Sequence, residues 1–558
     1  MIRRLTAILA LTVGTIVPGN PLAQSLEGRV VEVRLDNGML FLLVPKAEAP
    51  VFFGTVIVRV GGVDDPQGRS GLAHLFEHMA FKGTPWIGTV SYGQELGVIR
   101  RIDSVAVLYT EALSPIPLAD REILGALERR TGQAVMSTSP PLDEHEFQRA
   151  LATALAETLE IAGDRYPSLD RYVNAKRLYA EMKYLMAVQS TYVVKDEFSR
   201  IVRSNGGVGF NAGTGKDYTI YYESFPANRL ELWAMLESER FLYPVMREFY
   251  SERDVVAEER RMRTDDDPEG KLYEQFMATA MQAHPYRVPI VGWMSEVQRV
   301  TAADALRFRG MYYVPRNAVG VLVGDFDVGE ARRIVTRYFG RVPGAESPVP
   351  EVPTLEPPQI GERRILVEFD AQPQVMIGYH KPNYPHPDAY VFSVIANIVR
   401  DSGNSSRLYR RLVKSGIAQE ASIYEETPGQ RYPNLCMFQV LPAAPHSTEE
   451  VEKILYAELD SLANHPVSEF ELQKCKNQLD AAFVRGLSDN AELAQQLARA
   501  QAVHGDWRLV ATHREMVSRV TVGDIMRVAR TYFTKENRTV ATLVRPAGER
   551  HAAAMVEE

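Results

Sequence analysis

The stretch Arg299-Val-Thr-Ala-Ala-Asp-Ala-Leu-Arg recurs 220 residues later as Arg519-Val-Thr-Val-Gly-Asp-Ile-Met-Arg. Each copy predicts a helix with a threonine N-cap, Thr301 or Thr521, and a β-rich run follows each helix after a turn. These runs cover 318–323 and 539–544. A repeat with so long a period indicates two copies of one domain, because solenoid proteins repeat at shorter intervals. We therefore expect two homologous domains in one chain.

A proline-rich segment separates the two copies. Residues 343–358 contain six prolines and no helical period, which is typical of a semi-rigid linker. We therefore predict a first domain over 25–342 and a second domain over 359–548, with residues 549–558 as a tail.

The composition excludes several classes of protein. The chain has 558 residues, of which 45% are hydrophobic and 24% charged, so it can bury a sizeable core and is not intrinsically disordered. The formal net charge of −8 lacks the basic excess with which proteins bind nucleic acid. The two cysteines, Cys436 and Cys475, are too few for a disulfide scaffold or a four-thiolate metal site.

The N-terminus has the order of a secretory signal peptide. Arg3 and Arg4 precede an apolar run over 5–17, and helix-breaking proline and glycine residues follow. The run is too short to cross a bilayer, which takes about 20 residues, and no other stretch reaches that length. A buried N-terminal helix is the alternative. We expect residues 1–24 to be a signal peptide and the mature protein to be soluble and exported, with the periplasm as its compartment.

Strands and helices follow one another irregularly in the first domain. The pattern predicts a strand at 51–60, a glycine-punctuated loop at 61–71, an amphipathic helix at 72–81, long helices at 122–161 and 169–186, and a strand with a glycine-rich interruption at 210–222. A doubly wound fold requires a regular βαβ alternation, which this chain does not show. We predict an α+β fold of two homologous domains, each made of layers of helix and sheet.

One motif on the helix at 72–81 carries chemistry. In His74-Leu-Phe-Glu77-His78 the two imidazoles and the carboxylate share one helical face. Two such histidines can bind Zn²⁺, and the carboxylate between them can act as general base on a water at the metal. The alternative is an ordinary helix with two partly exposed histidines and a solvated glutamate. The flanking Gly71 and Gly83 mark where the helix begins and ends, which favours the metal site.

A catalytic zinc ion needs a third protein ligand and an open position. Neither a third histidine nor a cysteine lies near the motif, and the best carboxylate donors are Glu252 and Glu259. They are seven residues apart, two turns along one face of a predicted helix, so one can bind the metal while the other orients a ligand. Taken alone, the segment has the pattern of a solvated charged helix.

Together these residues resemble the inverted-motif zinc peptidases, the family of pitrilysin, insulin-degrading enzyme and the mitochondrial processing peptidase. In that family His-x-x-Glu-His reverses the order of the common zincin motif. The similarity extends over nearly the whole mature chain. The matching stretches are Gly61-Gly-Val-Asp-Asp, 74–84, Gly206-Gly-Val-Gly-Phe-Asn-Ala, 252–262, His284-Pro-Tyr and Ser405-Ser-Arg-Leu. The resemblance implies a bacterial exported member of half length, with its two domains forming a half-clamshell.

The resemblance also implies an activity, that of a zinc metalloendopeptidase acting on unstructured peptides or small polypeptides. It assigns the zinc ligands, the general base, a residue that supports the site, and the strand along which the substrate backbone pairs. In that order these are His74, His78 and Glu259; Glu77; Glu252; and Asn211 with Ala212. The competing hypotheses are a catalytically inactive scaffold or assembly subunit of the same family and a zinc-buffering exported protein.

The chain departs from the family pattern within the first domain. His78 and Glu259 are 181 residues apart, farther than is usual in the family. The excess falls at about 86–190, where the long helices are predicted. We therefore expect a helical insertion that covers the site or binds a partner.

The second domain departs from the family pattern at functional positions. The segment 391–400, which matches the zinc-binding helix, has no His, Glu or Cys, so we expect it to form a wall. Aligned on Gly416, the family's helper arginine and tyrosine are replaced by Leu412 and Gln419, and Arg411 is one step out of register. Half-length members of the family often pair. We therefore expect a dimer, and specifically a heterodimer in which a paralogue supplies the helper pair.

Overall fold

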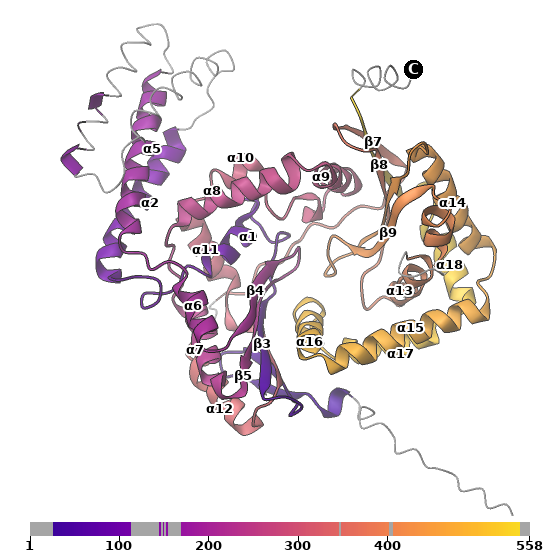
Figure 1. Ribbon diagram of the computed structural model, residues 1–558, viewed down its shortest axis with the longest axis horizontal. Helices are drawn as coiled ribbons and strands as arrows, with labels where there is room; N and C mark the ends of the chain where they lie inside the picture. Colours follow the sequence, from indigo (N-terminus) through magenta and orange to yellow (C-terminus); the bar gives the residue numbers. More distant parts are fainter. Residues whose placement is uncertain are drawn as a thin grey trace, which may run out of the picture.

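The protein is described from a computed structural model that covers residues 26–112, 144–146, 149, 152–153, 169–344, 347–400 and 406–546, with the side chains of 169–173 excepted. The predicted signal peptide lies outside the described residues, as does most of the helix predicted at 122–161. The protein consists of two sheets, each covered by helices, which lie side by side (Figure 1). The predicted α+β fold is confirmed.

The first sheet has six strands in the order β1-β2-β6-β3-β5-β4. They are β1 (Val31–Arg34), β2 (Leu40–Pro45), β3 (Val51–Val58), β4 (Val208–Thr214), β5 (Thr219–Pro226) and β6 (Ala318–Gly324). Strand β3 lies antiparallel between β5 and β6, whereas β2 and β6 are parallel. The prediction of one interrupted strand at 210–222 is wrong, because the segment turns at 215–218 and forms the β4–β5 hairpin at the edge of the sheet.

Helices α1 (Leu72–Met79), α7 (Leu230–Leu242) and α12 (Val328–Phe339) pack on one face of this sheet. Helices α8 (Phe249–Arg260) and α11 (Ala302–Tyr312) pack on α1, and α10 (Met294–Val297) packs on α8. Aromatic rings fill the space between sheet and helices: Phe52 packs edge-on against Trp233, and Phe41 against Phe339. Glycine at position 54 is required, because an added Cβ would lie 2.5 Å from the ring of Trp233.

The second sheet repeats this plan with five strands in the order β7-β11-β8-β10-β9. They are β7 (Arg363–Glu368), β8 (Gln374–Lys381), β9 (Ala418–Thr427), β10 (Asn434–Pro442) and β11 (Arg538–Val544). The helices are α13 (Pro387–Val399), α14 (Thr448–Asn464), α15 (Glu469–Ser488), α17 (Leu509–Arg519) and α18 (Val522–Tyr532). The predicted N-caps are confirmed, since Thr301 and Thr521 begin α11 and α18 with the same capping box.

Each domain gives one helix to the other. Helix α9 (Pro268–Ala280) follows α8 in the chain but packs on the second sheet, where Phe276 and Met277 join a core with Met376 and Leu543. Helix α16 (Asn490–His504) packs on the first sheet and lies between the two sheets in Figure 1. The two helices begin at equivalent places in the repeat. The exchange is therefore reciprocal, and the cores do not separate at the linker.

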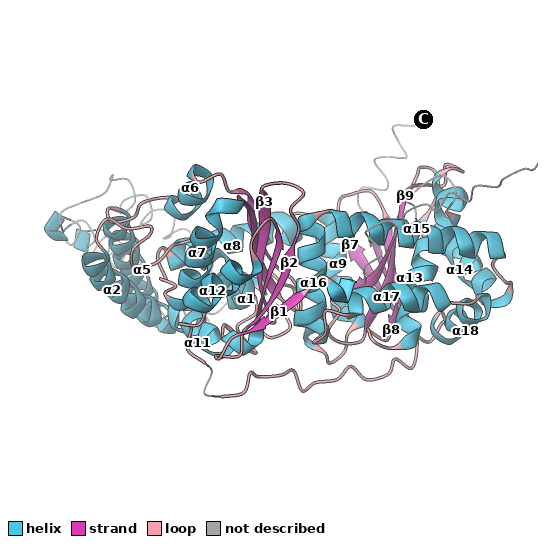
Figure 2. Ribbon diagram, turned by 90° about the horizontal axis from the view of Figure 1, so that it is seen from below, coloured by secondary structure: helices cyan, strands magenta, loops and turns pink. Residues whose placement is uncertain are grey.

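The linker and the predicted insertion lie on the outside of the molecule. The described part of 343–358 contains no helix or strand and runs past both sheets (Figure 2). Helices α2 (Tyr92–Ala112) and α5 (Leu169–Ser190) pack against each other and project from the first domain, and α6 (Glu197–Ser204) leads back to β4. No helix in the described part of the chain is both long and apolar enough to cross a membrane.

Candidate metal centre and active site

Helix α1 is held in place by its surroundings. It begins after Gly71, whose φ of 85° is a left-handed conformation that favours glycine. The carboxylate of Asp65 accepts hydrogen bonds from the backbone N–H groups of Gly71 and Ala73, both at 2.8 Å. Seven of the eight helical residues are buried, and His78 is the partly exposed one. The motif therefore lies on a fixed element at the base of the site.

Three side chains from α1 and α8 converge on one point. His74 Nε2 lies 3.7 Å from Glu259 Oε2, and His78 Nε2 lies 3.6 Å from the same oxygen. All three ligand atoms lie within 4.8 Å of one another, and no other such group occurs among the described residues. A tetrahedral zinc with bonds of 2.0–2.2 Å places its ligand atoms roughly 3.3–3.6 Å apart. The two histidine–glutamate distances are close to this spacing, so the donor set fits zinc.

The protonation of His74 suits a metal ligand. Burial, the neighbouring His78 and Arg263 lower the pKa of His74 to about 3. The imidazole is therefore neutral at physiological pH and keeps the ring nitrogen lone pair that a metal requires.

Glu252 lies on the far side of His78 from Glu259. Its Oε2 lies 3.3 Å from His78 Nδ1, and its other oxygen pairs with Lys82. Burial lowers the pKa of His78, but the hydrogen bond with Glu252 and the charges of Glu77 and Glu259 outweigh it and raise the pKa. The hydrogen bond on Nδ1 turns Nε2 toward Glu259. Glu252 is thus placed to orient His78.

Glu77 is buried beside the metal-facing groups, which are the side chains of His74, His78 and Glu259. Its Oε2 accepts a hydrogen bond of 2.6 Å from the hydroxyl of Thr214, at the end of β4. Burial raises the pKa of Glu77, and the bond from Thr214 opposes the rise. Sequence reasoning missed Thr214. The available signal was its place three residues after Asn211 on the strand predicted to lie beside the motif.

Asn211 and Ala212 lie on β4, the edge strand of the first sheet. Asn211 is exposed, is paired with Tyr222 on β5, and accepts a hydrogen bond from the N–H of Ala212. The other edge of β4 has no strand partner among the described residues, and α1 packs beside it. An open edge next to the metal-facing groups can accept an added strand.

A cavity of about 470 Å³ opens beside Glu77 and His78. The segment 193–199, which returns from the helical insertion, forms one wall, and Lys82 and Glu248 contribute to another. Lys82 Nζ lies 3.2 Å from Glu248 Oε2. The lining is mainly polar, so the cavity suits polar parts of a ligand rather than a large apolar side chain.

An arginine that sequence reasoning also missed joins the walls of the site. The buried guanidinium of Arg240 pairs with Glu237 at 2.8 Å. It also lies within 5.7 Å of the centres of four aromatic rings. One ring belongs to the segment that follows α1, and the others belong to α6, β4 and β5. These rings belong to Phe81, Phe198, Phe210 and Tyr221. Cation–π contacts of this kind hold the surrounding elements together.

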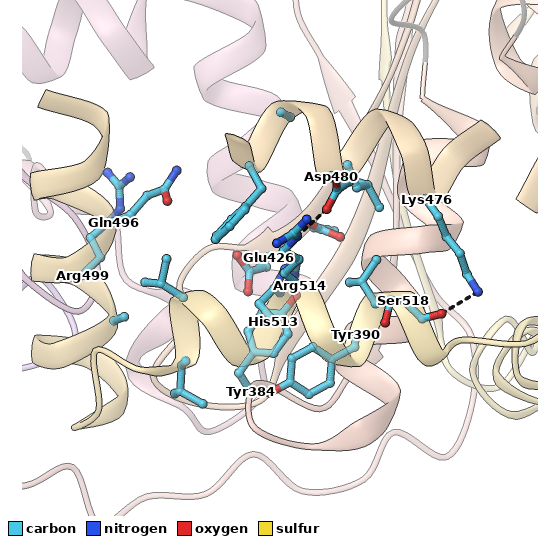
Figure 3. A pocket seen from close by; sticks show the side chains of 18 of the residues that line it. Tyr384, Tyr390, Glu426, Lys476, Asp480, Gln496, Arg499, His513, Arg514 and Ser518 are labelled. Carbon is cyan, nitrogen blue, oxygen red and sulfur yellow. Dashed lines mark hydrogen bonds and ion pairs between the residues drawn. The ribbon is translucent and has the colours of Figure 1, made fainter. Parts of the chain in front are cut away.

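The second domain offers a different kind of cavity. It measures about 930 Å³ and lies between β9 and helices α13, α15, α16 and α17 (Figure 3). Glu426, His513 and Tyr384 line it, and Asp480 pairs with Arg514 at its wall. None of its residues belongs to the metal-capable group of the described chain.

The helper positions of the second domain contain no arginine–tyrosine pair. Leu412 is fully buried in the core of that domain, and Gln419 is exposed on β9. Arg411 is exposed and pairs with Glu458 at 3.4 Å.

Sequence comparison identifies the family. The chain matches the model of insulinase, peptidase family M16, over residues 45–92, and that of the peptidase M16 inactive domain over 299–479. It is 31% identical to the zinc protease PqqE of Helicobacter pylori over 358 residues, which are 63% of this chain and 79% of that protein. It is 27% identical to an uncharacterized zinc protease of Mycobacterium leprae over 339 residues, 59% of this chain and 74% of that one.

Solved structures agree on the fold. A protease from Helicobacter pylori has a TM-score of 0.70 at 24% identity, covering 92% of this chain and 99% of that chain. The periplasmic protease PqqL from Escherichia coli has a TM-score of 0.61 at 15% identity, covering 94% of this chain and 48% of that chain. With the metal-facing groups, the two sheets and these relatives together, the chain belongs to peptidase family M16.

Proposed function

We propose that the protein is a zinc-dependent endopeptidase that hydrolyses unstructured peptides or small polypeptides. The observation that carries this proposal is the convergence of His74 Nε2, His78 Nε2 and Glu259 Oε2 on one point beside the buried Glu77. Zinc bound there would supply Lewis-acid chemistry, polarising the scissile carbonyl and lowering the pKa of water. The names of the relatives, zinc proteases, support the same activity.

Glu77 would move the proton. Its Oε2 accepts a hydrogen bond from the Thr214 hydroxyl, which would hold the carboxylate in place to take a proton from the attacking water. Burial raises the pKa of this carboxylate and so increases its basicity. The same group can then pass the proton to the departing amine.

The edge of β4 would bind the substrate backbone. An extended peptide can pair with the free edge near Asn211 and Ala212, and the cavity beside His78 can receive one of its side chains. Pairing of this kind requires an extended chain, so folded proteins would be poor substrates.

The test is a Glu77→Gln variant assayed with a quenched-fluorescent peptide library and by metal analysis. We expect it to retain stoichiometric zinc and to lose cleavage. Glu258→Gln is the matched control, because Glu258 is an exposed glutamate on α8 next to Glu259, and it should leave cleavage unchanged. Survival of cleavage in Glu77→Gln would refute the role of the base. A wild-type protein without zinc would support the inactive scaffold, and one that binds zinc without cleaving any peptide would support zinc buffering.

A paralogous partner and export are further parts of the proposal. The absence of an arginine–tyrosine pair at Leu412 and Gln419 supports a heterodimer in which another chain supplies those groups. Full activity of a purified homomer would contradict it. Export to the periplasm rests on the residues before position 25, and N-terminal sequencing of protein from a periplasmic fraction tests it.

A further inference from the structure

We propose that the second domain positions the general base, through Asp217 in the turn between β4 and β5. A segment of the second domain, 428–433, holds this carboxylate, and the held turn keeps Thr214 against Glu77. The inference rests on the proposed function, because it concerns how the catalytic carboxylate is oriented. Asp217 and the segment 428–433 do not touch the metal-facing groups, so Asp217 is a positioning residue.

The position of Thr214 depends on the turn that follows it. Thr214 and Thr219 are the last paired residues of the β4–β5 hairpin, and their hydroxyls lie 3.4 Å apart. The N–H of Gly215 donates to the carbonyl of Tyr218 at 2.9 Å and closes the turn. A movement of the turn would therefore move the hydroxyl that bonds to Glu77.

The carboxylate of Asp217 ties this turn to the second domain. It is 2% exposed and accepts three hydrogen bonds. Its Oδ2 accepts from the backbone N–H groups of Gln430 at 2.6 Å and Arg431 at 3.1 Å, and its Oδ1 accepts from the hydroxyl of Tyr286 at 2.6 Å. Hydrogen bonds to a buried carboxylate are among the stronger ones in proteins. Two of the three donors come from the second domain.

A second attachment reinforces the first. Arg431 Nη1 lies 3.0 Å from Asp64 Oδ1, and both side chains are almost fully buried. The loop that contains Asp64 is bonded to the hairpin turn, through Gly62 N to Gly215 O at 3.1 Å and Val63 N to Lys216 O at 3.0 Å. The loop and the turn thus form one unit, and the second domain binds it through the carboxylates of Asp64 and Asp217.

Gly429 shows how closely the two parts approach. A Cβ at this position would lie 2.4 Å from Asp217 Oδ2 and 2.7 Å from the hydroxyl of Tyr286. A side chain larger than hydrogen would therefore displace the Asp217 carboxylate or the Tyr286 hydroxyl and disturb the hydrogen bonds between them and the second domain. The contact therefore requires glycine at a position outside the metal-facing group.

The experiment compares Asp217→Asn and Gly429→Ala with the wild-type enzyme. We expect kcat to fall about 10- to 100-fold, because small errors in the placement of a catalytic group cost rate of this order. KM and zinc stoichiometry should be unchanged. Gly523→Ala is the matched control, since a Cβ there meets nothing closer than 3.7 Å, and it should leave kcat unchanged.

A double-mutant cycle separates positioning from a general structural role. If Asp217 acts through Thr214, then Asp217→Asn combined with Thr214→Val should lose no more kcat than Thr214→Val alone. Additive losses, or losses that follow the fraction of unfolded protein, would overturn the proposal.

A readout without turnover distinguishes failure of this proposal from failure of the proposed function. Hydrogen–deuterium exchange of the peptide covering 208–226 should increase in Asp217→Asn and Gly429→Ala. Unchanged hydrogen–deuterium exchange would overturn the proposal that the second domain holds the β4–β5 turn, even in an active enzyme. Increased hydrogen–deuterium exchange in a zinc-loaded protein that cleaves no peptide would support this contact between the turn and the second domain. It would refute the peptidase assignment instead.

Discussion

The reciprocal exchange of α9 and α16 predicts that a mutation in the second half of the chain destabilises the first sheet. Leu497 on α16 is fully buried, in a core it shares with Leu42 of β2 and Val321 of β6. Leu497→Ala removes three buried carbon atoms, which costs about 2.5 kcal/mol in lost transfer free energy. The cavity left behind brings the expected loss of stability to about 3–5 kcal/mol.

Hydrogen–deuterium exchange resolved by peptide is the appropriate assay, because unfolding of a two-domain chain need not be two-state. A loss of about 3 kcal/mol corresponds to a roughly hundredfold increase in the opening equilibrium. We expect this increase in peptides from β2, β3 and β6, although Leu497 lies in the second half of the chain. Leu306→Ala, at a leucine that is 45% exposed on α11, is the control and should change exchange little. An increase in hydrogen–deuterium exchange that is confined to peptides of the second domain would refute the conclusion that α16 supports the first sheet.

Three further predictions concern metal, pH and the domain contact. Chelation of zinc should lower the melting temperature, because a ligand at 1,000 times its Kd stabilises the folded state by about 4 kcal/mol; an unchanged temperature would argue against a metal that joins α1 to α8. Burial lowers the pKa of His513 to about 4, below its unfolded value near 6.5, so its contribution is complete above pH 6.5 and is lost as the pH falls toward 4. Between pH 7.5 and 5 this loss is about 2 kcal/mol, and His513→Gln should flatten the pH dependence of unfolding by that amount; an identical slope in the variant would contradict it. Arg431→Met should cost about 3–5 kcal/mol by leaving the buried Asp64 carboxylate unpaired, and Asp64→Leu combined with Arg431→Met should recover part of it; equal losses in the single and double variants would show that the charge is not the cause.

Local spacing was sufficient to predict the parts of the site that lie on one element. His74, Glu77 and His78 share a helical face in any α-helix, and Glu252 and Glu259 do so on α8. Their spacing also led us to expect that one glutamate would face the histidines and that the other would orient a histidine ring. Which glutamate takes which place was implied by the family resemblance, and the packing of α8 beside α1 agrees with it.

The wrong prediction at 210–222 has a clear cause. Gly213 and Gly215 lie within one β-rich run, and the pattern does not distinguish a bulged strand from a tight hairpin. The structure shows both, since a bulge precedes Asn211 and a turn follows Thr214. The turn matters functionally, because it places Asp217 within reach of the second domain.

The sequence by itself determined the helix that carries His74, Glu77 and His78, the capped helices at Thr301 and Thr521, and the presence of two related domains. Each of these depends on residues within a few turns or on a direct repeat, so a local period is enough to reveal them. Only the tertiary structure decided three contacts. Thr214 donates a hydrogen bond to Glu77, α9 and α16 each pack on the sheet of the other domain, and the second domain donates hydrogen bonds to Asp217. These contacts join residues that are far apart in the sequence, and they depend on side-chain packing and hydrogen-bond geometry that no local pattern encodes.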